Sequence, residues 1–150
     1  MTTVLLAFAL GSLWTVAAVL DAPPSSYLLA WFGIVLVSID LRHHRLPDVL
    51  TLPLAAGLLL LEFQRLGEAA LSALLFGGAH LAVRRWRPAV MGGGDVKLAA
   101  GLGAPLPLPL LLPAAILSSA VTLVLALAKR TRRVPHGPGL LAATWALTTL

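Results

Sequence analysis

The chain has 150 residues, of which 59% are hydrophobic and only 11% are charged, and its mean hydropathy is +0.93. A water-soluble domain usually carries about 25% charged residues, so this composition indicates an integral membrane protein built mostly from helices. The net charge of +5 comes without the basic surface and interleaved aromatic side chains of a nucleic-acid-binding protein. Cysteine is absent, which excludes disulfides, thiolate metal sites and a cysteine nucleophile.

Apolar runs separated by short polar breaks predict an all-α, polytopic membrane bundle that forms one domain over residues 1–150. The first run can span about 28 Å and lacks the basic start of a signal peptide, so we expect it to remain as a span. The apolar stretch 96–128 is too long for one span, and the proline cluster at residues 105–109 should end a helix. We therefore expect about six to seven spanning or partly spanning helices, over residues 2–20, 27–40, 49–61, 69–83, 96–104, 110–128 and 140–150.

The basic residues sort onto one side of this bundle. With a cytoplasmic N-terminus, the inside connections hold ten of the eleven Lys and Arg residues, and only Arg65 falls outside, in agreement with the positive-inside rule. Asp40 ends the second run, Asp48 precedes the third and Asp95 precedes the fifth, so these three acids lie at the same face. Carboxylates at a membrane edge are by default candidates for a functional site.

Three glycines, at positions 92, 93 and 94, directly precede Asp95. We expect them to allow positive φ, to let another backbone approach closely, and to act as a hinge for the helix that follows. Asp95 is predicted to be the N-cap of that helix, beside the positive end of its dipole, whereas Asp40 lies at a helix C-terminus. Two such carboxyls can activate a water and protonate a leaving amine. Asp95 should then be mainly ionised, and Asp40 should mainly hold the proton.

The neighbouring polar residues have simpler interpretations. Asp48 follows Pro47 and is predicted to be the N-cap of the next helix. Lys97 either extends to lipid headgroups or contacts a substrate carbonyl. His43 and His44 are adjacent and therefore point in different directions, so we expect no metal site there.

One further histidine, His80, stands alone on an apolar run. Such a histidine is more typical of a hydrogen bond between helices than of a reactive site.

Three segments resemble signatures of the type IV prepilin leader peptidase family. Residues 40–54 resemble the first signature, and residues 92–98 resemble the second, a glycine-x-glycine-aspartate motif followed by x-Lys-Leu. Residues 134–138 are similar to the family's Pro-Phe-Gly-Pro segment, with His136 where phenylalanine is usual. The three segments occur in the family's order and cover most of residues 33–150.

The resemblance implies an intramembrane aspartic endopeptidase that removes leader peptides from type IV pilin-like precursors at the cytoplasmic face of the bacterial inner membrane. Carried over by position, Asp40 and Asp95 match the family's two catalytic aspartates. The residues expected to bind substrate or support the motifs are Gly92, Gly93, Gly94, Lys97, Pro47 and Asp48. No metal or cofactor is expected.

The same resemblance bears on partners and on a second activity. The expected partners are a pilin or pseudopilin precursor and membrane lipid, and a homodimer remains open. Larger members carry an N-terminal region with paired cysteine motifs that is linked to N-methylation. Because cysteine is absent, the chain resembles the short members, and we expect peptidase activity alone.

Two other functions remain open. Asp40 and Asp95 could bind a proton or cation in a carrier or channel, with the glycines as a broken-helix site. That function predicts paired short helices in related halves of the chain, and no such repeat is evident. Alternatively, the chain is a catalytically silent membrane subunit that positions a partner, in which case either aspartate tolerates replacement by asparagine.

Overall fold

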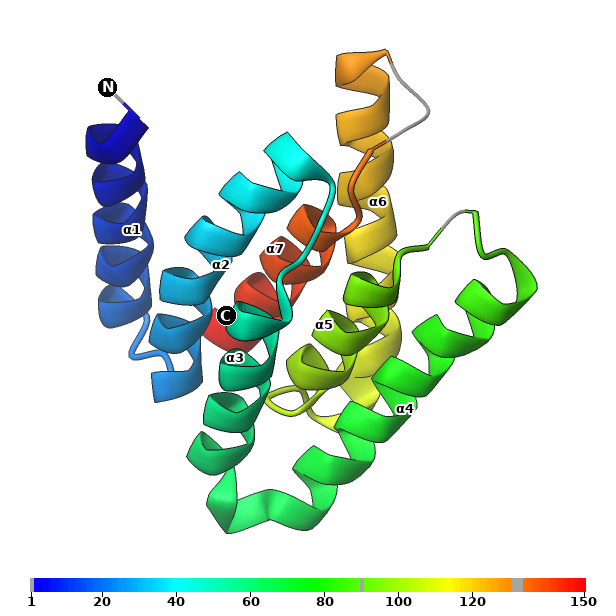
Figure 1. Cartoon of the computed structure of the whole chain (residues 1–150). Helices are drawn as coiled ribbons and strands as arrows, with labels where there is room; N and C mark the ends of the chain where they lie inside the picture. The colour runs from blue at the N-terminus through cyan, green and yellow to red at the C-terminus, as the bar shows by residue number, and fades with distance from the viewer. Residues whose placement is uncertain (1, 90, 131–133) are drawn as a thin grey trace.

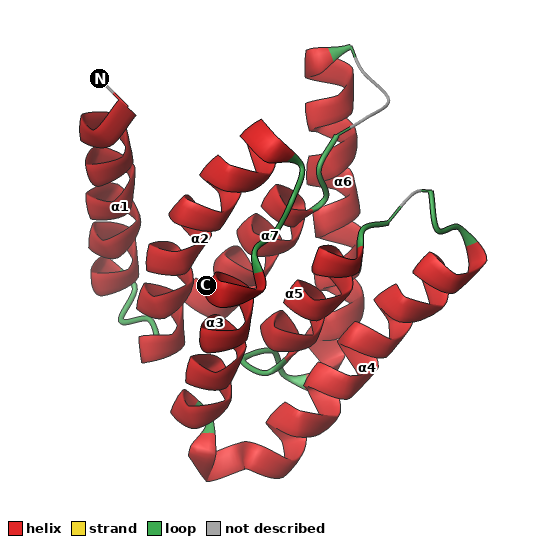
Figure 2. Ribbon diagram, in the orientation of Figure 1, coloured by secondary structure: helices red, strands yellow, loops and turns green. Residues whose placement is uncertain are grey.

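The computed structural model describes residues 2–89, 91–130 and 134–150. Over these ranges the chain forms seven α-helices and two short 3₁₀ helices, with no strand (Figures 1 and 2). The α-helices are α1 (Thr2–Val19), α2 (Pro24–His43), α3 (Asp48–Leu61), α4 (Leu66–Trp86), α5 (Gly93–Gly103), α6 (Leu111–Lys129) and α7 (Gly137–Thr149). The predicted all-α class is therefore confirmed.

Helix α2 extends beyond the predicted apolar run at both ends. It begins at Pro24, whose fixed φ suits the first turn of a helix. Its last turn includes Arg42 and His43, which the sequence had indicated as loop. His44 ends the helix with φ 51°, and its N–H donates to the Asp40 carbonyl at 2.9 Å. Asp40 consequently lies within the last turn of α2, not at its final residue.

The long apolar stretch 96–128 is divided as predicted. Helix α5 ends at Gly103, and α6 begins at Leu111 after a 3₁₀ turn, Leu108–Leu110. The connection is tied to the start of α4 by Arg65, whose Nη2 donates to the Pro105 carbonyl at 2.7 Å. Arg65 also forms an ion pair with Glu62 at 2.8 Å. Arg65, the basic residue that the charge pattern left outside, thus has a structural role.

Helix α5 lies at the centre of the bundle, packed against α3, α4 and α7 (Figure 1). Small residues permit this position, because backbones can then approach closely. A Cβ at Gly101 would meet the Cβ of Ala55 on α3 at 2.7 Å, and one at Gly103 would meet the Ser72 carbonyl oxygen on α4 at 2.6 Å. Around this helix the core is built mainly from fully buried leucines: Leu29, Leu36, Leu54, Leu58, Leu98, Leu102 and Leu140.

The outer surface of the bundle is apolar. Val4, Phe8, Leu74, Leu112 and Val124 each expose more than 60% of their surface. Three helical segments are long and apolar enough to cross a membrane: Pro24–His43, Phe63–Trp86 and Leu108–Lys129. Because apolar surface is unfavourable in water, these features indicate a membrane protein.

The helix ends that flank the polar connections share one end of the bundle. In Figure 1 the last turns of α2, α4 and α6 and the first turns of α5 and α7 are the upper ends of these helices. This is the grouping that the charge pattern predicted. Which side of a membrane this end faces stays a prediction.

Candidate active site

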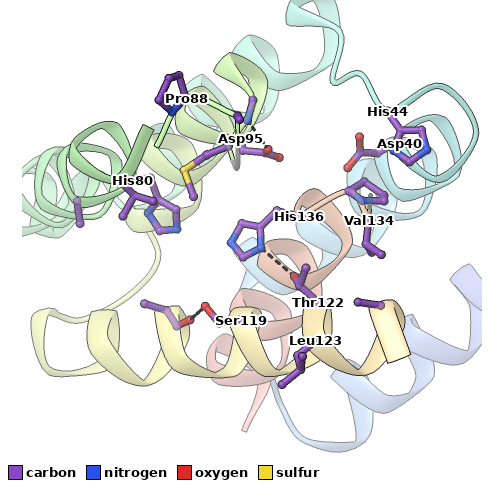
Figure 3. A pocket seen from close by; sticks show the side chains of 18 residues that line it. Asp40, His44, His80, Pro88, Asp95, Ser119, Thr122, Leu123, Val134 and His136 are labelled. Carbon is purple, nitrogen blue, oxygen red and sulfur yellow. Dashed lines mark hydrogen bonds between the residues drawn. The ribbon is translucent and has the colours of Figure 1, made fainter. Parts of the chain in front are cut away.

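A cavity of about 950 Å³ lies at the polar end of the bundle, among helices that are distant in sequence. Its polar lining comes from five elements: Asp40 on α2, His80 on α4, Asp95 on α5, Thr122 on α6, and His136 just before α7 (Figure 3). Ala79, Val83, Leu123 and Ala126 supply apolar walls. The cavity therefore combines ionisable groups with apolar walls.

The two aspartates predicted as a pair line this one cavity. Figure 3 shows both carboxyl groups projecting into it from opposite walls. Asp40 is only 3% exposed, and its Oδ2 has no hydrogen-bond partner among the described residues. Asp95 Oδ2 accepts the backbone N–H of Gly92 at 3.1 Å, at the N-terminus of α5. The N-terminus of α5 and the Gly92 N–H favour negative charge on Asp95, and the Gly137 N–H lies beside the carboxyl group of Asp40.

Neither of the predicted N-caps is correct. The N-cap of α5 is Gly92, and Asp95 is at position N3, where its carboxylate accepts the N-cap N–H as in one half of a capping box. The N-cap of α3 is Pro47, and Asp48 is the first residue of the helix. In both cases the helix begins earlier than the acid, and each carboxylate still lies in the first turn, where the helix dipole favours it.

Lys97 contacts Asp48 rather than standing free. Its Nζ lies 2.6 Å from Asp48 Oδ2, and the ion pair joins α5 to α3. Both side chains are about half exposed (52% and 50%), so the pair should contribute no more than about 1 kcal/mol to stability. Neither residue lines the cavity of the two aspartates. Their assignment to substrate binding stays a prediction.

The glycines before Asp95 do not adopt the backbone conformation that we expected. No described glycine has a positive φ. Close approach is the reason that the structure supports, most firmly at Gly94, where a Cβ would meet the Cβ of Leu46 at 2.9 Å. A Cβ at Gly93 would meet Arg84 Nη1 at 2.8 Å, the far end of a flexible side chain. The glycines thus let α5 begin against its neighbours, while the predicted hinge motion stays untested.

Gly137, at the start of α7, supports the site in a way that sequence reasoning missed. A Cβ at this position would collide with Asp40 Oδ2. The absence of a side chain lets α7 begin directly against the carboxyl group. The only signal in the sequence was the segment that resembles a family motif, and that signal did not indicate which aspartate it would meet.

Three histidines also line the cavity: His44, His80 and His136. Sequence reasoning assigned neither His80 nor His136 to the site. His136 Nδ1 lies 2.8 Å from Thr122 Oγ1. His80 was interpreted as a hydrogen-bonding residue between helices, but its Nδ1 bonds to the Phe76 carbonyl of its own helix at 2.7 Å. The two ring centroids are 6.0 Å apart. Within residues 2–89, 91–130 and 134–150, no three His, Asp or Glu side chains are arranged to hold a metal ion.

His136 should make the stability of the fold depend on pH. Burial lowers the pKa of His136 from 6.5 to about 4, and the nearby His80 adds to the lowering. Between pH 6.5 and pH 4, His136 binds a proton in the unfolded chain but not in the folded chain. Its contribution therefore lowers the free energy of unfolding increasingly as pH falls from 6.5 toward 4. The variant His136→Phe cannot take up this proton.

Thermal unfolding in one detergent measures the effect. The Tm of His136→Phe relative to wild type should rise as pH is lowered through this window. A Tm difference that stays constant from pH 7 to pH 4 would contradict the prediction. Using the difference between the two proteins cancels the titration of the other acids.

Comparisons with known proteins identify the family of the chain. The pattern of the type IV leader peptidase family matches residues 27–127, a range that includes Asp40 and Asp95. The chain is 38% identical over 135 residues to "Prepilin leader peptidase/N-methyltransferase" of Xanthomonas campestris pv. campestris, and 35% identical over 139 residues to the protein of the same name from Aeromonas hydrophila. The alignments cover 79% and 81% of this chain but 47% of each relative.

The chain therefore spans about half the length of the curated relatives it matches. No solved structure matches it significantly. Both relatives have a peptidase name, as does the family whose pattern matches. The chain belongs to the type IV leader peptidase family.

Proposed function

We propose that the chain is an intramembrane aspartic endopeptidase that cleaves the leader from type IV pilin-like precursors at the cytoplasmic face of the inner membrane. The observation that carries this proposal is that Asp40 and Asp95, from two different helices, line a single cavity at the polar end of the bundle. The names of the relatives support the class of substrate. The grouping of basic residues supports the orientation.

The two aspartates would share the chemistry between them. Asp95 accepts a proton from a water as the water oxygen attacks the scissile carbonyl carbon, and Asp40 donates its proton to the carbonyl oxygen. The intermediate then collapses: the amine nitrogen takes the proton from Asp95, the C–N bond breaks, and one hydroxyl returns a proton to Asp40. The Gly92 N–H beside Asp95 and the unpartnered Oδ2 of Asp40 support this division of roles.

Infrared spectroscopy can test the division of roles. A neutral carboxyl band in the wild type should disappear in Asp40→Asn and persist in Asp95→Asn. A band that disappears only in Asp95→Asn would reverse the two assignments.

The apolar part of a precursor would reach the aspartates from the side. Ala115, Thr122 and Ala126 on α6 face the cavity opposite Ala79 and Val83 on α4. Small residues on a helix allow another helix to pack closely in a membrane. We therefore expect the apolar segment of the precursor to enter between α4 and α6, with its polar end directed to the aspartates.

Incubation of the purified chain with a type IV prepilin precursor in detergent tests the proposed function. Mass spectrometry of the products should show one cut that releases the leader, and a new N-terminus without an added methyl group. Failure of the wild type to cut, together with a proton flux in liposomes that depends on Asp40 and Asp95, would instead support a carrier. Failure of both assays would support a subunit without catalytic activity.

A further inference from the structure

The hydroxyl groups of Ser119 and Thr122 on the cavity wall donate their hydrogens to backbone carbonyls within α6. Ser119 Oγ donates to the Ala115 carbonyl at 2.8 Å (Figure 3). Thr122 Oγ1 donates to the Ser118 carbonyl at 2.8 Å. A carbonyl oxygen has no hydrogen to give, so the direction of both bonds is fixed. Neither hydroxyl can donate to a molecule in the cavity without losing its bond within α6.

The same reasoning fixes the tautomer of His136. Because Thr122 Oγ1 has spent its one hydrogen on Ser118, it can only accept from His136 Nδ1 at 2.8 Å. The neutral ring therefore carries its hydrogen on Nδ1, and Nε2 keeps a free lone pair. The low pKa of His136, about 4, keeps the ring neutral at physiological pH.

The rest of the polar lining also offers acceptors. His80 Nδ1 must donate to the Phe76 carbonyl, so a neutral His80 likewise presents Nε2 as an acceptor. The Gly137 N–H lies beside the carboxyl group of Asp40, but Asp40 Oδ2 itself is buried without a hydrogen-bond partner among the described residues. Among the described histidines that line the cavity, His44 is the one whose tautomer is not fixed by a hydrogen bond to a described residue, and its side chain is exposed at the rim. The proposed mechanism uses the proton of Asp40 on the scissile carbonyl, so a substrate side chain that meets the rest of this lining is best matched if it carries a donor.

We infer that His136 is a specificity-determining residue whose Nε2 accepts a hydrogen bond from a hydroxyl or amide side chain of the precursor, next to the scissile bond. This inference rests on the proposed function. The placement is supported by two observations: His136 lines the same cavity as both aspartates, and Gly137, the next residue, lies against Asp40. A precursor with Ser, Thr, Asn or Gln at the contacted position is therefore preferred to one with an apolar residue of the same shape.

Precursors that differ only in one donor provide the test. Each residue flanking the cut is made threonine in one precursor and valine in another, since the two side chains have the same shape and only threonine donates. For the wild type, kcat/KM should favour threonine at one of these positions by about tenfold or more. His136→Phe, a ring without a lone pair, should abolish or reverse this preference.

Two further variants separate specificity from packing. His136→Gln, which restores an acceptor, should recover part of the preference for threonine. Ser119→Ala, which removes a cavity hydroxyl whose hydrogen is already used, should keep the wild-type ratio between the two precursors. A merely structural role for His136 would change the rates for both precursors together and leave their ratio unchanged.

The outcomes distinguish this inference from the proposed function. If the wild type cuts precursors without any threonine preference, or if His136→Phe keeps the preference, the inference is wrong and the proposed function stands. If the wild type cuts no precursor, the proposed function fails and the inference fails with it. Nitrogen-15 NMR of labelled histidine adds a test without substrate: a hydrogen on Nε2 of His136 would overturn the inference.

Discussion

Replacing either Asp40 or Asp95 with asparagine should reduce precursor cleavage by about 10²–10⁴-fold, the range expected when a group that transfers protons is removed. Asparagine has nearly the same shape as aspartate, but it can neither accept a proton from water nor donate one to a carbonyl oxygen. Both carboxyls line the same cavity, so each single variant should lose nearly as much activity as the double variant. Initial rates at equal protein concentration in one detergent measure the effect.

Asp21→Asn is the matched control for these variants. Asp21 lies in the connection between α1 and α2, away from the cavity, and its φ of 53° is one that asparagine adopts readily. The same chemical change should therefore leave cleavage at the wild-type rate. If Asp40→Asn or Asp95→Asn cuts as fast as this control, the assignment of that aspartate is wrong. Asp48, at the same end of the bundle, is then the next residue to replace.

Gly137→Ala should lower cleavage by about 10²-fold, the loss that a displacement of roughly 1 Å in a catalytic group can produce. The added Cβ would occupy the space of Asp40 Oδ2, so either the carboxyl group or the start of α7 must move. The fold should persist, because the nearest atoms belong to the side chains of Asp40 and Leu46, at a helix end, and not to the backbone. Cleavage rate and thermal unfolding are measured on the same preparation.

Gly78→Ala provides the corresponding control within α4. A Cβ at Gly78 would meet nothing within 4 Å, and alanine favours a helix over glycine by about 1 kcal/mol. This variant should unfold at the same or a slightly higher temperature and cut at the wild-type rate. Equal cleavage by Gly137→Ala and Gly78→Ala would show that the contact between Gly137 and Asp40 does not position the carboxyl group.

Several parts of the site could not be predicted because they join residues that are far apart in the chain. The contact between Lys97 and Asp48 crosses 49 positions, and the one between His136 and Thr122 crosses 14. Rules for helix ends consider only neighbours within about one turn. They therefore predicted Asp48 as an N-cap and did not indicate that a lysine on another helix would contact its carboxylate.

The glycines illustrate the same limit. A run of three glycines before Asp95 indicated an unusual backbone, but positive φ and close packing are both common reasons for glycine. Only the position of Arg84 and Leu46 against Gly93 and Gly94 decides for close packing. Because these neighbours come from other segments of the chain, the local sequence could not separate the two reasons.

By itself, the sequence determined the all-α membrane class, the division of residues 96–128 into two helices, and the two aspartates at one end of the bundle. These features depend on local properties: the length of apolar runs, the missing N–H of proline, and the motifs around Asp40 and Asp95. The tertiary structure alone decided that His80 and His136 join the aspartates in one cavity and that Gly137 lies against Asp40. The packing of α4, α6 and α7 around α5 brings these groups together, and such packing depends on all the helices at once.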